Sequence, residues 1–170
     1  MPYSIYDASI PVYKQGLITM SHLLDKLEEH AKAKNIPVEN FLSAKLAVDM
    51  FDFKRQIQIA CDFAKTGCSR LSGQEPPSHP DTETTVADLR ARIQKVEALL
   101  TTIKPEQLKG AEERVIKFSV PTGMAFEFTG TRFVTHWSLP NFFFHITTAY
   151  NILRHNGVEI GKKDFIGVTS

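Results

Sequence analysis

Apolar residues recur in alternating steps of four and three along three long stretches, and this spacing restricts the possible fold more than any other feature. Such spacing collects the apolar side chains on one face of an α-helix, as in the seam of a helix bundle. The seams consist of Tyr13, Leu17, Met20, Leu24, Leu27 and Ala31; Phe53, Ile57, Ala60, Ala64, Cys68 and Leu71; and Val86, Leu89, Ile93, Val96, Leu100 and Ile103. They predict amphipathic helices over residues 7–34 or 9–34, 52–72 and 85–104.

A fourth helix is predicted over residues 139–157, with an apolar stripe of Phe142, Ile146, Ala149 and Leu153. Pro140 stands near its start and Gly157 at its end, the positions at which helices favour these two residues. Ser138 is available as its N-cap. Four amphipathic helices in one chain favour a four-helix bundle.

Between the third and fourth helices the apolar period changes from helical to two. Ile116, Phe118 and Val120 alternate with polar residues before the turn at 121–123, and Phe126 and Phe128 alternate after it. This pattern predicts a β-hairpin. Residues 37–50 are expected to connect two helices with one or two helical turns, and the proline-rich segment 73–83 to form a loop. The tail from residue 158 shows no helical period, although Ile160, Phe165 and Ile166 could hold it against the bundle. The predicted fold is mainly α, a single domain over residues 1–170.

Charge and composition exclude several classes of function. The 170 residues carry 20 Lys and Arg against 19 Asp and Glu, a net charge of +1, without a basic cluster. Nucleic acid and membranes are therefore not expected as partners. No apolar stretch approaches the ~20 residues that span a bilayer, and no leader sequence is expected. Cys61 and Cys68 are expected to be buried free thiols, which favours a cytoplasmic location.

His145 lies inside the apolar stripe of the fourth helix, where an imidazole must find a partner or bind something. Gln56 projects close to the stripe of the second helix, whereas Arg55, Gln58, Asp62 and Ser69 are expected to point away from it. A core histidine bonded to Gln56 or to a backbone carbonyl is favoured over a metal ligand, because Ala149 occupies the position four residues later.

Tyr150 and Arg154 share another side of the fourth helix with Phe143 and Thr147. Arg154 could bind a carboxylate ligand, although a structural pair with Asp49, Asp52 or Asp164 is favoured. The same side could instead be the surface of a homodimer, since four-helix proteins of this size commonly self-associate.

Two segments together, residues 46–65 (LAVDMFDFKRQIQIACDFAK) and 139–167 (LPNFFFHITTAYNILRHNGVEIGKKDFIG), resemble the uncharacterised family of the domain of unknown function nineteen-ninety-three. That family belongs with the DinB/YfiT-like helical bundles, described as candidate metalloenzymes. The resemblance covers nearly the whole chain and implies an up-down four-helix bundle with a long crossover.

The resemblance also implies a site. DinB-like metalloproteins use three histidines, one on the second helix and two spaced four apart on the fourth, and some catalyse metal-dependent thiol transfer. Only His145 can be carried over, since Ala149 replaces the second position and the second helix has no histidine.

The first hypothesis is therefore a DinB-like bundle without a metal or other cofactor, which binds a small-molecule ligand through His145, Gln56, Tyr150 and Arg154. The alternative is a divalent-metal-dependent enzyme, a thiol transferase or hydrolase, whose non-standard site joins His145 with Asp49 or Glu127. A third is a protein that acts only through interactions of its outer helix faces.

Overall fold

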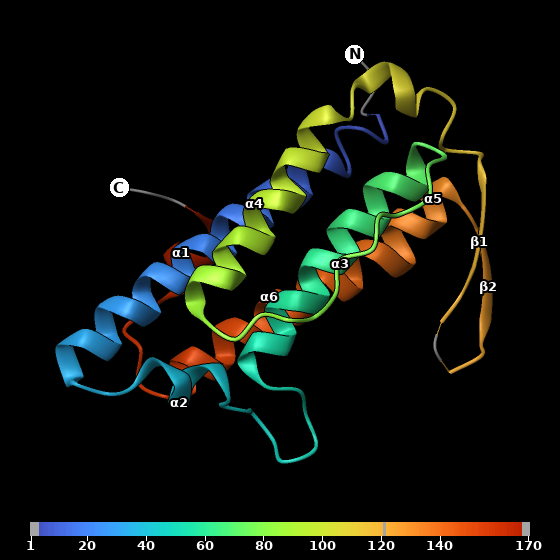
Figure 1. Ribbon diagram of the computed structural model, residues 1–170. Coiled ribbons are helices and arrows are strands. Elements are labelled where there is room, and N and C mark those ends of the chain that lie inside the picture. Colours follow the sequence, from blue (N-terminus) through green and yellow to red (C-terminus); the bar gives the residue numbers. More distant parts are fainter. Residues whose placement is uncertain (1–3, 121, 168–170) are drawn as a thin grey trace.

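The computed structural model describes residues 4–120 and 122–167. Within this part of the chain, four long helices form the bundle: α1 (Ile10–Lys34), α3 (Phe53–Leu71), α4 (Val86–Thr102) and α6 (Leu139–His155). α1 and α3 each pack against both α4 and α6, so they lie diagonally opposite each other. Figure 1 shows that α1 and α6 run in one direction and that α3 and α4 run in the other. The predicted four-helix bundle is confirmed.

At the starts of α3 and α4, side chains bond the free backbone N–H groups. Asp52 caps α3, its carboxylate accepting from Arg55 N at 2.8 Å. Thr85 and Asp88 form a capping box at the start of α4, at 3.1 Å from Asp88 N to Thr85 Oγ1 and 2.9 Å from Thr85 N to Asp88 Oδ2. Each pair satisfies donors that have no partner within the helix. These local bonds explain why the helix limits agree closely with the sequence pattern.

The segment after α3 is the long crossover, and it runs back along α3 to the start of α4 (Figure 1). It buries Gln58, whose Nε2 donates to Glu83 Oε2 at 2.8 Å. The expectation that Gln58 and Ser69 point away from the core is therefore wrong, because both are at most 2% exposed. On α4, Arg92 is also buried and donates to Glu83 Oε1 and Asp62 Oδ1, both at 2.9 Å.

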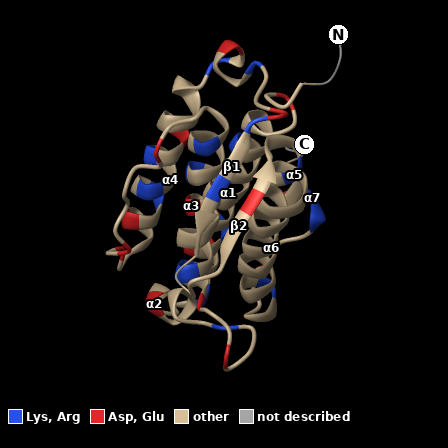
Figure 2. Cartoon of the chain, turned by 90° about the vertical axis from the view of Figure 1, so that its right-hand side faces the viewer, with Lys and Arg blue, Asp and Glu red and all other residues tan. Residues whose placement is uncertain are grey.

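The predicted β-hairpin is present as β1 (Val115–Ser119) and β2 (Ala125–Thr129), paired antiparallel with Phe118 opposite Phe126. Of its expected turn, Pro121 lies outside the described residues. Figure 2 shows the hairpin in front of the bundle. It is attached through aromatic rings, the closest pair being Phe126 and Trp137 with centroids 4.4 Å apart.

The fourth helical region begins nine residues earlier than the sequence predicts. Short helix α5 (Gly130–Phe133) continues into the π-helical turn η2 (Val134–Ser138) and then into α6. Ser138 is therefore no N-cap: it has helical dihedral angles, and its hydroxyl is hydrogen-bonded to that of Tyr13 at 2.6 Å. Pro140 has no N–H to offer the preceding turn, and the wider π turn lies directly before it.

Two short helices lie in described connections between the bundle helices, α2 (Val38–Leu42) and η1 (Pro105–Leu108), and a third, α7 (Lys162–Ile166), lies in the tail. α7 gives the tail a helical turn that its sequence pattern does not predict. It is fixed on α1 by Thr19 Oγ1, which donates to Phe165 O at 2.8 Å, and by His22 Nε2, 2.7 Å from Asp164 Oδ1. Over the described ranges, no helix combines the length and apolar character needed to cross a bilayer.

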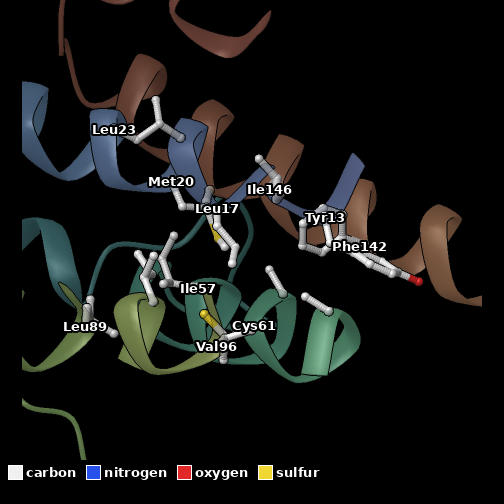
Figure 3. Close-up of a cluster of buried hydrophobic side chains, with 14 of the residues drawn as sticks. Tyr13, Leu17, Met20, Leu23, Ile57, Cys61, Leu89, Val96, Phe142 and Ile146 are labelled. Carbon is white, nitrogen blue, oxygen red and sulfur yellow. The ribbon is translucent and has the colours of Figure 1, made fainter. Parts of the chain in front are cut away.

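The core lies where the four seams meet, as Figure 3 shows for side chains from α1, α3, α4 and α6. Two glycines permit close packing there. A Cβ at Gly16 would lie 2.8 Å from Ile146 Cδ1, and one at Gly67 would lie 2.9 Å from Ser138 Oγ. Both distances are far below van der Waals contact, so these two positions require glycine.

Candidate functional site

The structure joins the two polar residues that the sequence singles out on the facing helices α3 and α6. His145 Nδ1 lies 2.7 Å from Gln56 Oε1. Gln56 is 1% exposed and His145 is 9% exposed. α3 and α6 run antiparallel and pack along their length, so each holds one member of the pair. Of the two expected partners of the imidazole, Gln56 and a backbone carbonyl, Gln56 is the one observed.

The backbone before α3 fixes the direction of this hydrogen bond. Gln56 Nε2 donates to the carbonyl oxygen of Phe51 at 3.1 Å. Because a carbonyl can only accept, the amide nitrogen must face Phe51 and the amide oxygen must face His145. That oxygen can only accept as well, so His145 carries its proton on Nδ1. The lone pair of His145 then lies on Nε2.

The Nε2 atom of His145 is open to a further partner. No described residue forms a hydrogen bond with Nε2, and the atom is not fully shielded from solvent. The ring of Phe63 stacks on the imidazole with centroids 5.8 Å apart, and Phe144 meets it edge-on at 5.3 Å. The imidazole that carries the free lone pair is thus in contact with two aromatic rings.

Burial keeps this imidazole neutral. It lowers the pKa of His145 from 6.5 to about 4, and the positive charge of nearby Arg55 acts in the same direction. At neutral pH the side chain is therefore an uncharged hydrogen-bond acceptor or base. A protonated imidazole would have to be desolvated next to a guanidinium group, which is unfavourable.

The donor set does not fit the three-histidine metal site of DinB-like metalloproteins. Ala149 stands one turn after His145, and Gln56 is the residue that faces it from α3. Among the described residues, no group of three or more His, Cys, Asp or Glu side chains is placed to hold a metal ion. Glu127, a candidate ligand in the alternative hypothesis, lies on β2 and pairs with Lys117 at 2.8 Å.

The structure does not bring Tyr150 and Arg154 to this pair. Tyr150 donates to Ile160 O at 3.5 Å and its ring meets Phe165, while Arg154 Nη1 donates to Val158 O at 3.5 Å. Both therefore bond the backbone of the tail that follows α6. Asp164, one of the expected partners of Arg154, instead bonds His22 on α1.

Sequence reasoning missed the ion-pair network at the other side of α3. Arg92 joins Asp62, Asp81 and Glu83 at 2.9–3.0 Å, and Lys65 Nζ lies 2.7 Å from Asp62 Oδ1. The relevant pattern is that Arg92 stands three residues after Leu89 and four before Val96, close to the apolar seam. A charged residue at that position predicts a partner of opposite charge. Nothing in the sequence shows that residues of the crossover provide this partner.

The chain was compared with protein families, with solved structures and with proteins of curated function. The model of a domain of unknown function, DUF1993, matches residues 5–166. A solved structure of a DinB family member protein from Shewanella denitrificans is 42% identical, covers 96% of this chain and 92% of its own, and superposes with a TM-score of 0.89. No protein of curated function matches the sequence.

Proposed function

We propose that this chain, which belongs to the DUF1993 family and has a DinB-like fold, binds a small molecule through His145 and Gln56. The family and the fold agree with the resemblance drawn from the sequence. Ligand binding is our inference from the geometry of the pair.

One observation carries the proposal: the relay from Phe51 O through the Gln56 amide fixes the lone pair of His145 on the open Nε2 atom. An acceptor atom without a protein partner can take a hydrogen bond from a ligand that reaches it. The complementary ligand offers an N–H or O–H donor and is uncharged at the donor, since a neutral imidazole stands there. Phe63 and Phe144 would contact its apolar part.

The proposal requires no metal. Of the three histidines that DinB-like metalloproteins use, the chain retains His145 alone. The proposed ligand binding therefore involves no metal ion. Elemental analysis after incubation with zinc, nickel and manganese should give well under one metal per chain. Unit stoichiometry that is lost in His145→Ala would overturn this part of the proposal and favour the metalloenzyme alternative.

A matched pair of probes tests ligand binding. Phenol presents an O–H donor on an aromatic ring, and anisole carries a methyl group in its place. Long-range ¹H–¹⁵N NMR of the histidine rings should show a saturable shift of the His145 Nε2 resonance with phenol and a much smaller shift with anisole. The exposed His155 supplies the control, since His155→Gln should leave the phenol response unchanged. Equal responses to both probes, or no response at His145, would contradict the proposal.

Three further predictions concern the whole chain. Residues 1–170 are proposed as one domain, supported by a single core cluster that extends from Ile5 to Ile160. A homodimer is proposed from the size and bundle architecture, and light scattering on the purified protein tests it. The cytoplasmic location is tested by cell fractionation.

A further inference from the structure

A hollow lies between α3, the hairpin and η2. Its volume is about 200 Å³. Three aromatic rings, Phe63, Phe118 and Trp137, line it together with Arg70, Asp62 and Thr66. We call it the hairpin groove. Figure 1 shows that β1 and β2 stand outside the bundle, beside the C-terminal end of α3.

Arg70 is a cation without a counter-ion in this groove. Its guanidinium carbon lies 4.1 Å from the centre of the Phe118 ring. Among the residues that the structure describes, none forms a salt bridge or hydrogen bond with its side chain, and Glu75 acts on it only through space. The side chain is half-buried. A guanidinium removed from water in this way favours an anionic partner.

The contact with Phe118 uses none of the N–H donors of the guanidinium. Arginine carries five such donors in a planar fork, and in Arg70 none of them bonds a described residue. Those donors match the two oxygens of a carboxylate. The aromatic ring therefore holds Arg70 in place without using the donors that would bind a ligand.

The acidic residue in the groove does not cancel this charge. Asp62 Oδ1 already accepts from Arg92 Nη2 at 2.9 Å and lies 2.7 Å from Lys65 Nζ. Two cations thus already neutralise Asp62. The positive charge of Arg70 remains available to a ligand.

From this arrangement we propose that the hairpin groove binds a small carboxylate with a flat apolar body, its carboxylate on Arg70 and its body against Phe63 and Trp137. This site does not depend on the hydrogen bond of His145, although Phe63 forms a wall of both. The walls favour an aromatic or unsaturated ring over a long flexible chain, because the volume is small and the surfaces are planar.

The sequence provides its own probe, since Trp137 is the single tryptophan. Phenylacetate carries one carboxylate on an aromatic ring, and phenylacetamide is its neutral counterpart of the same shape. Excited at the red edge of its absorption, Trp137 should show a saturable change of fluorescence with phenylacetate. Phenylacetamide should bind at least about tenfold more weakly, the loss of one charge-assisted contact. Acetate, which lacks the ring, should also bind weakly.

Two arginine variants locate the effect. Arg70→Gln should weaken phenylacetate binding by about tenfold or more, while Arg132→Gln, which removes an exposed arginine on α5, should leave it unchanged. Equal affinity of Arg70→Gln and the wild type, or equal affinity of the two probes, would overturn the proposal. So would the absence of a saturable response.

A further measurement avoids any dependence on the folding of Arg70→Gln. In the wild-type protein the Nε–H resonance of Arg70 should shift with phenylacetate and stay in place with phenylacetamide. A resonance that ignores both probes would reject the assignment of Arg70 as the anion-binding group.

Discussion

Replacement of His145 by glutamine should make the stability of the protein less dependent on pH. The imidazole titrates at about 4 in the folded chain and at 6.5 when it is free in water. As the pH falls from neutral, the unfolded chain takes up this proton first. Stability that is present above pH 6.5 is therefore lost on the way down to about pH 4.

The size of the effect follows from the shift. One pKa unit corresponds to about 1.4 kcal/mol, so the full shift is worth roughly 3 kcal/mol. Between about pH 7.5 and about pH 5, where most carboxylates stay ionised, linkage gives a loss of about 2 kcal/mol for this group alone. Glutamine at position 145 does not titrate, and the variant should lack this component.

The assay is urea unfolding of both proteins at the two pH values. The wild type should lose about 2 kcal/mol more than His145→Gln on acidification. All other titrating groups occur in both proteins, so the difference between the two losses belongs to position 145. His155→Gln, which changes an exposed histidine of the same helix, should behave as the wild type. Equal losses in wild type and His145→Gln would show that the imidazole titrates as in water, and would refute the buried neutral acceptor.

Three other perturbations have outcomes set by the packing. Gly67→Ala should destabilise the fold by about 1–3 kcal/mol, since the new Cβ would overlap the Tyr13 hydroxyl, whereas Gly161→Ala has open space and should be nearly neutral in thermal melts. Arg92→Met should cost about 1–3 kcal/mol, because it removes a buried guanidinium and leaves the partly buried Glu83 without a cation, while Arg90→Met on the same helix removes only partly exposed pairs and should cost under about 1 kcal/mol by urea unfolding. Burial raises the pKa of the two cysteine thiols to about 12 and about 11, so both should resist thiol reagents in the folded protein and react once it is unfolded; rapid labelling of the native protein would contradict their burial.

The helices could be predicted from sequence because local chemistry decides them. Thr85 with Asp88 and the apolar seams act within a few residues, and the structure follows them closely. The start of the fourth helical region could not be predicted. Proline is typical of the first turn of a helix, so Pro140 indicated a start at residue 139. In the structure a π turn lets the helix continue upstream to Gly130, and Ser138 in that turn is hydrogen-bonded to Tyr13 on α1.

The candidate site shows the same division. His145 and Gln56 could be found because one is a polar residue inside an apolar stripe and the other lies close to one. The burial of Gln58 and Arg92 could not, because a segment without periodicity covers them. Arg70 was also hidden, since its relevant neighbour is a strand residue, Phe118, 48 positions later in the chain. Only tertiary structure brings such residues together.

The π turn at Val134–Ser138 has a consequence for how the molecule could change over time. A π turn holds one residue more than the α-helical turn it replaces, so it behaves as a single-residue insertion inside a helix. Deleting one residue there would restore a regular helix and rotate everything before it by about 100° relative to α6. The β-hairpin would swing away from α3 and the hairpin groove would be lost, while His145 would keep its place against Gln56. A single residue in the π turn thus sets the orientation of the hairpin relative to α6, while the packing of α3 against α6 can stay constant.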